Sequence, residues 1–181
     1  MTIDSKAAEM KAALDAAYAV CAAARTAPKA CGIDVLDTLI LTDDDKTAVA
    51  NEMRRISENG GGAFFARDAG NVDASLAIVL VGAKPSVRRL GSICGLCGFK
   101  NCIECENAGA QCIYPALDLG IALGSAVASA TDMRVDSRIM FTIGKAAASL
   151  GLLGEYSLIM GIPISISGKS PFFDRPMPEN K

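Results

Sequence analysis

Residues 76–82 read Leu-Ala-Ile-Val-Leu-Val-Gly, a continuously apolar run of the length of one strand. A strand of this kind is apolar on both of its faces, which is typical of a sheet that helices cover on both sides. We therefore expect this segment to be a buried strand. Two further apolar runs, 37–41 and 156–166, predict strands on either side of it in the chain, although Pro163 weakens the second.

Outside these three predicted strands, most of the sequence has patterns typical of helices. Four helices are expected, at residues 4–26, 42–59, 115–131 and 136–150. The first has Asp4 or Ser5 as its cap and is stopped by Pro28. The second starts with the hydroxyl of Thr42 followed by three aspartates, and three glycines end it. Together these elements predict a single α+β domain over residues 1–181.

Composition excludes several classes of function. The chain has 18 basic and 20 acidic residues, which argues against nucleic-acid binding. It has no histidine, which excludes Ser-His-Asp and Cys-His catalysis and any zinc site that contains histidine. Hydrophobic residues make up 51% of the chain, and we expect part of them to form the interface of a homodimer.

Sequence patterns also indicate the cellular compartment of the protein. The N-terminus lacks the basic and then apolar pattern of a signal peptide. The apolar stretch 113–130 contains Asp118 and two glycines, so we interpret it as a buried helix and expect no membrane association. Seven cysteines, an odd number, in a chain without an export signal argue against a disulfide framework and favour the cytoplasm.

Five of these cysteines fall in the segment 91–113, which is inserted between a strand and a helix. They are Cys94, Cys97, Cys102, Cys105 and Cys112. Thiolates are the ligands of soft and redox-active metals, and four of them form the usual shell of an iron–sulfur cluster. The nearby Arg88, Arg89 and Lys100 favour thiolate over thiol. The segment therefore predicts a metal centre.

Three interpretations of this centre stay open. A structural zinc site with four cysteine ligands normally has a longer spacer between its two Cys-x2-Cys pairs than the four residues found here. Buried, inert cysteines are improbable at this density. An iron–sulfur cluster fits the spacing, and a [4Fe-4S] cluster with Cys94, Cys97, Cys102 and Cys112 as ligands is our prediction. The alternative set begins with Cys97, Cys102 and Cys105, which have the opening spacing of plant-type [2Fe-2S] ferredoxins.

The order Cys94, Cys97-Gly98 and Cys102 resembles the iron–sulfur domains of the corrinoid iron–sulfur protein and of the Rnf electron-transport complex. The fourth cysteine of those families corresponds to Cys112 here, at a shorter spacing. Over nearly its full length the chain resembles a family of uncharacterised proteins of anaerobes that contain a ferredoxin domain. The shared stretches are 94–102 and 118–126.

Outside the cysteine segment the chain is similar to the nitroreductase family. The Ala27-Pro28 turn, the helix around 118–130 and the segment Met160-Gly-Ile-Pro163 carry this resemblance. It implies a mixed sheet flanked by helices, an intertwined homodimer and FMN at the dimer interface. By the same resemblance Arg25, Lys169 and Arg175 are the candidate contacts of the FMN phosphate.

The sequence thus predicts a cytoplasmic, homodimeric redox protein that binds an iron–sulfur cluster and passes electrons to a redox partner protein or to a flavin. If it is an enzyme, it is a flavin-dependent oxidoreductase of the nitroreductase type. The alternatives are a non-enzymatic module with a structural zinc site and a cluster-based redox sensor.

Overall fold

A computed structural model describes residues 1–173 of the chain. The helices are α1 (Ser5–Thr26), α2 (Asp43–Ile56), α3 (Ala63–Asp73), α4 (Cys102–Asn107), α5 (Tyr114–Asp132) and α6 (Phe141–Ser149). The strands are β1 (Leu36–Leu41), β2 (Ala77–Ala83), β3 (Asp136–Ser137) and β4 (Leu158–Ser165). They form a sheet in the order β1-β2-β4-β3, in which every described pair is antiparallel. The α+β class is therefore confirmed, with an antiparallel sheet in place of the expected mixed one.

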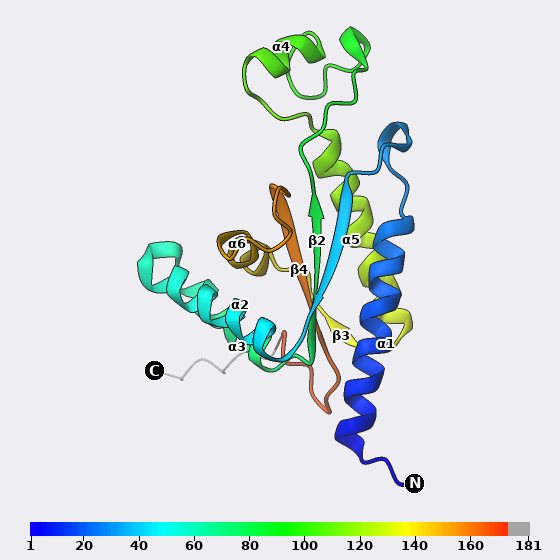
Figure 1. The fold of residues 1–181 in the computed structure, drawn as a ribbon, viewed down its shortest axis with the longest axis vertical. Helices are drawn as coiled ribbons and strands as arrows, with labels where there is room; N and C mark the ends of the chain where they lie inside the picture. Colours follow the sequence, from blue (N-terminus) through cyan, green and yellow to red (C-terminus); the bar gives the residue numbers. More distant parts are fainter. Residues whose placement is uncertain (174–181) are drawn as a thin grey trace, which may run out of the picture.

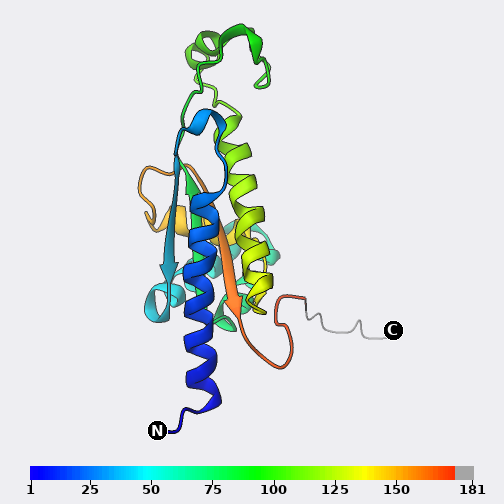
Figure 2. The ribbon, with the colours of Figure 1, turned by 90° about the vertical axis from the view of Figure 1, so that its right-hand side faces the viewer.

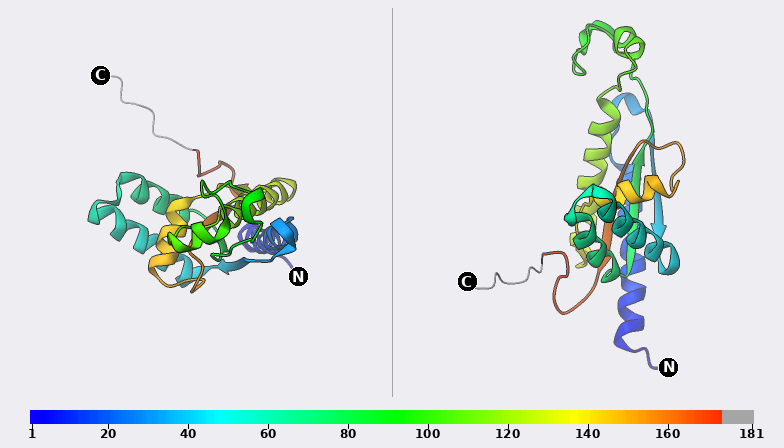
Figure 3. Two further views of the ribbon diagram at one scale, coloured as in Figure 1. Left: turned by 90° about the horizontal axis from the view of Figure 1, so that it is seen from above. Right: turned by 90° about the vertical axis from the view of Figure 1, so that its left-hand side faces the viewer.

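The sheet is the middle layer of three. Along β2, Val79 and Val81 face the side covered by α1 and α5, whereas Ile78 and Leu80 face the side covered by α2, α3 and α6. All seven residues of β2 are buried, as expected for a strand between two layers of helices. Figure 1 and Figure 3 show the long helices α1 and α5 on one face of the sheet and the shorter helices on the other.

Several sequence predictions are confirmed at the level of single residues. The carboxylate of Asp4 accepts a hydrogen bond from the backbone N–H of Ala7 (2.8 Å), and α1 ends two residues before Pro28. Strand β4 contains Pro163, which pairs with Ile78 in the register of the sheet.

Three expectations need correction. Residues 136–150 are not one helix, because Asp136 and Ser137 pair with β4 and the helix begins only at Phe141. Helix α3 lies where no element is predicted. Thr42 occupies the N-cap position of α2, but its hydroxyl accepts no hydrogen bond from the first turn.

The five cysteines from Cys94 to Cys112 lie in a lobe that projects from one end of the three layers (Figures 1 and 2). We call residues 85–113 the cysteine lobe: it leaves the sheet after β2 and returns to the body at the start of α5. Among the described residues, no helix has the length and apolar character needed to cross a membrane.

Candidate metal centre

The cysteine lobe is ordered by local hydrogen bonds. The side chain of Asn101 accepts a hydrogen bond from the backbone N–H of Glu104 (2.9 Å) and so caps α4. The carboxylate of Glu104 accepts in return from the backbone N–H of Lys100 (3.3 Å), one residue before the cap. Gly109 has a φ of 65°, which lets the chain reverse after α4 and brings Cys112 back.

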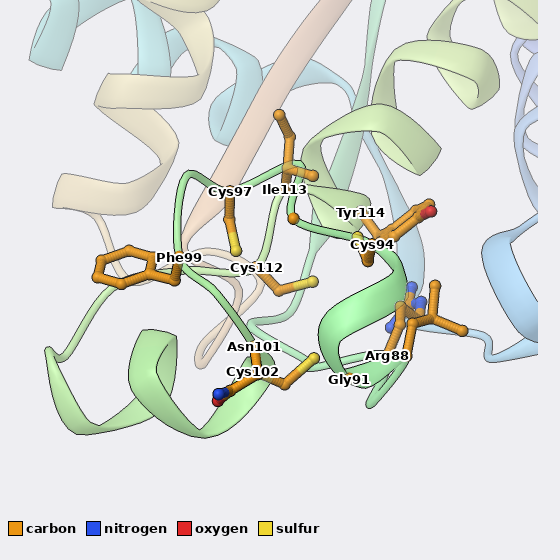
Figure 4. Close-up of a pocket in the computed structure, with 12 residues that line it drawn as sticks. Arg88, Gly91, Cys94, Cys97, Phe99, Asn101, Cys102, Cys112, Ile113 and Tyr114 are labelled. Carbon is orange, nitrogen blue, oxygen red and sulfur yellow. The ribbon is translucent and has the colours of Figure 1, made fainter.

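Four cysteines line one pocket in the lobe, and they are Cys94, Cys97, Cys102 and Cys112. Figure 4 shows the side chains of Cys97, Cys102 and Cys112 pointing toward a common space. The other residues that line the pocket are Arg88, Leu90, Gly91, Gly95, Phe99, Asn101, Ile113 and Tyr114. Within residues 1–173, no group of three or more Cys, Asp or Glu side chains converges closely enough to hold a single metal ion. The thiols surround a shared space instead.

Cys105 differs from these four in its surroundings. Its side chain is 1% exposed, and its Sγ–H donates to the carbonyl oxygen of Ala110 at 3.6 Å. Burial raises the pKa of the Cys105 thiol, and a hydrogen bond with Cys97 together with the charges of neighbouring thiolates adds to the effect. Cys105 is not among the residues that line the pocket. The Cys105 thiol is therefore buried inside the lobe and lies beside Cys97, and its role as a bystander to the metal stays a prediction.

The start of α5 lies directly at the pocket, because Cys112, Ile113 and Tyr114 all line it. The unpaired N–H groups at a helix N-terminus carry a partial positive charge, which stabilises an anionic group nearby. Burial raises the pKa of the Tyr114 hydroxyl, and the charge of Cys94 and a hydrogen bond with that thiol raise it further. The pocket thus combines the thiols of four cysteines with a positive helix end.

A buried ion pair joins the lobe to the body. Arg88 Nη2 lies 2.5 Å from Asp118 Oδ2, and the two side chains are 1% and 2% exposed. The other oxygen of Asp118 accepts a hydrogen bond from the backbone N–H of Ala30 (2.9 Å). Since Arg88 belongs to the lobe and Asp118 to α5, this pair fixes the lobe against α5 and the loop that follows α1. The sequence places Arg88 near the cysteines, but it does not reveal this partner thirty positions away.

The two other basic residues near the cysteines have different surroundings. Arg89 is 70% exposed and pairs with Glu106 at 2.9 Å, and Lys100 is exposed. Charges in water are strongly screened, so neither contributes as much to the pocket as a buried group does.

The two candidate flavin contacts that the structure describes, Arg25 and Lys169, lie in different parts of the chain. Arg25 lies in the last turn of α1, at the end near the lobe, and pairs with Asp34 at 2.6 Å. Lys169 follows β4, which runs toward the opposite end of the molecule (Figure 2). Arg175 lies outside the described residues. Their role as phosphate contacts therefore stays a prediction.

The chain has relatives among known proteins. Residues 108–175 match the family described as uncharacterized protein containing a ferredoxin domain, a segment that includes Cys112 but not Cys94 to Cys105. The chain is 41% identical over 168 residues to an uncharacterized protein of Archaeoglobus fulgidus, and the match covers 88% of this chain and 90% of the relative.

Solved structures show the same fold at low sequence identity. The nitroreductase CinD from Lactococcus lactis, in complex with nicotinic acid, is 15% identical with a TM-score of 0.56, covering 96% of this chain and 86% of CinD. A nitroreductase with bound FMN from Desulfitobacterium hafniense is 14% identical with a TM-score of 0.51, covering 86% of this chain and 78% of the other. The chain spans only about three fifths of longer proteins such as B. megaterium NfrA2, 61%, and Vibrio parahaemolyticus nitroreductase A, 62%. The fold is therefore nitroreductase-like.

Proposed function

Because the chain belongs to the family of uncharacterized proteins that contain a ferredoxin domain, we propose that it is an electron-transfer protein with an iron–sulfur cluster in the cysteine lobe. The observation that carries this proposal is the pocket lined by four cysteines from both ends of the lobe. Such a thiol set fits a cluster with four cysteine ligands. When bound, the cluster takes up and releases single electrons.

We assign the ligands to Cys94, Cys97, Cys102 and Cys112 and the cluster type to [4Fe-4S]. The alternative set of the plant type needs Cys105 as a ligand and leaves Cys94 without a role. Cys105 is buried inside the lobe, where it contacts Ala110 and Cys97, whereas Cys94 lines the pocket. The lining of the pocket therefore supports the first set.

The lobe also offers a surface for a redox partner protein. Ile93, Leu96 and Ile103 are 86%, 57% and 64% exposed, although all three lie within a few residues of the proposed ligands. An electron passes efficiently only when the cluster comes close to its donor or acceptor. We propose that the partner docks on this projecting lobe and that the protein works in the cytoplasm.

The spectrum of anaerobically purified protein tests this function. We expect a broad visible absorption band that bleaches when dithionite is added and returns on reoxidation without loss of iron. A colourless protein would indicate structural zinc, and a band lost irreversibly on oxidation would indicate a sensor.

FMN is the second candidate cofactor, and the nitroreductase-like fold favours it. The guanidinium of Arg25 is already paired with the carboxylate of Asp34 at 2.6 Å, and charge-assisted contacts dominate phosphate affinity. We therefore expect protein purified without added flavin to lack the yellow FMN spectrum. Stoichiometric FMN after purification would instead make the protein a flavin-dependent oxidoreductase.

We further propose that two copies of the chain associate through one face of α5. Leu117 and Ile121 on this face are 44% and 49% exposed. Gly120 and Gly124 lie beside them, exposed, and a Cβ atom at either position meets nothing within 4 Å. Packing within the described chain therefore gives no reason for glycine here, whereas close approach of a second helix does.

Replacing Gly124 by leucine tests the dimer. The side chain has open space in the single chain, and leucine favours a helix over glycine by up to about 1 kcal/mol. We expect a folded protein that light scattering at micromolar concentration reports as a monomer, while the wild type is a dimer. Gly70→Leu is the matched control, because Gly70 is also helical, exposed and without neighbours. A wild-type monomer, or a dimer that Gly124→Leu leaves intact, contradicts this interface.

A further inference from the structure

Arg88 lies in the wall of the cysteine pocket, in the stretch that connects β2 to the rest of the lobe. Its side chain is 1% exposed. Arginine is always charged in proteins, and burying it requires a hydrogen-bond partner for each of its donors. The partners of Arg88 therefore indicate what this residue does.

Two of its three nitrogens have hydrogen-bond partners within the protein. Nη2 donates to Asp118 Oδ2 at 2.5 Å and to the carbonyl oxygen of Ile33 at 3.5 Å. Nη1 donates to the hydroxyl of Ser86 at 2.8 Å. The third nitrogen, Nε, is buried and has no hydrogen-bond partner among residues 1–173. A buried donor without an acceptor is costly, and native proteins rarely leave one.

The guanidinium is held in place, so this free donor is not the result of a loose side chain. Asp118 is 2% exposed and is itself fixed by the backbone N–H of Ala30 at 2.9 Å. The carboxylate also cancels most of the long-range charge of Arg88. What Arg88 presents to its surroundings is therefore one oriented N–H group more than a net positive charge.

We infer that the Nε–H of Arg88 donates a hydrogen bond to a sulfur atom of the cluster and thereby raises the reduction potential of the cluster. This inference rests on the proposed function. Sulfur carries the negative charge of a cluster, and hydrogen bonds to it are among the features that set the potential. Reduction adds one negative charge, so a fixed donor stabilises the reduced form more than the oxidised form. Arg88 is thus a positioning residue for the cluster and a determinant of its potential.

The variant Arg88→Lys tests this role. Lysine keeps the positive charge that Asp118 needs, but it lacks the planar fork that serves Asp118 and a second acceptor at once. We expect the ratio of reduced to oxidised cluster, measured by electron paramagnetic resonance at a fixed solution potential, to fall about tenfold. For a one-electron couple this corresponds to about 59 mV.

Arg89→Lys is the matched control, because Arg89 is the next residue along the chain, is 70% exposed and pairs with Glu106. Its ratio is expected to equal that of the wild type. A wild type without iron and sulfide overturns the proposed function itself. A wild type with its cluster and an Arg88→Lys variant with the same ratio overturn only the role of Arg88.

If Arg88→Lys binds no iron, the comparison moves to both proteins after removal of iron. If the two iron-free chains have the same melting temperature, the variant loses iron because the contact with the cluster is missing, which supports the inference. If the iron-free variant melts at a lower temperature, it loses iron because its fold is weakened, which overturns the inference.

Discussion

Replacing Cys112 by serine is expected to remove most of the iron from anaerobically purified protein, whereas replacing Cys105 by serine leaves the iron content at the wild-type level. Cys112 lines the pocket, two residues before the start of α5. Cys105 lies inside α4, is 1% exposed and donates to the carbonyl oxygen of Ala110. A serine hydroxyl can make the same hydrogen bond but is a poor ligand for iron.

The measurement is iron per chain, determined by colorimetry together with the visible spectrum. Cys21→Ser serves as the control, since Cys21 lies in α1, outside the lobe. Full iron in Cys112→Ser combined with its loss in Cys105→Ser would reverse the assignment and favour the ligand set of the plant type.

Replacing Asp118 by asparagine is expected to lower the free energy of unfolding by about 3–5 kcal/mol, because it leaves the buried Arg88 without its counter-charge. The asparagine side chain has one acceptor oxygen, whereas the carboxylate accepts from both Ala30 and Arg88. Its amide group must therefore face another donor. Urea unfolding followed by circular dichroism measures the loss.

Two further variants separate charge from shape. Asp34→Asn removes the exposed partner of Arg25, and its expected cost is below about 1 kcal/mol. The double variant Arg88→Met, Asp118→Leu removes both buried charges, and we expect it to recover most of the stability that Asp118→Asn loses. Equal stability of Asp118→Asn and wild type would show that the pair does not hold the lobe to the body.

The sequence reveals those parts of the fold whose signal is local. Strand β2 is predictable because its residues are apolar on both faces, and both faces are indeed covered. Helix α4 is predictable because Asn101 and Glu104 stand at the spacing of a cap. Cys94, Cys97, Cys102 and Cys112 are close in the chain, so their gathering around one pocket follows from short-range geometry.

Other features depend on contacts between distant residues. Helix α3 starts after Gly62, which has a φ of 98° and provides no capping side chain, so the usual start signal is missing. Asp136 and Ser137 look like the start of a helix, but pairing with β4 makes them a strand. One feature of the sequence indicates the ion pair of Arg88 and Asp118. Asp118 is a charged residue in the apolar stretch 113–130, and such a residue needs a buried partner.

Whether the cysteine lobe binds an iron–sulfur cluster is tested most directly by metal and sulfide analysis of protein that has never been exposed to air. We predict about four iron atoms and about four acid-labile sulfides per chain, without stoichiometric zinc. Protein with one zinc per chain and neither iron nor sulfide would contradict the claim.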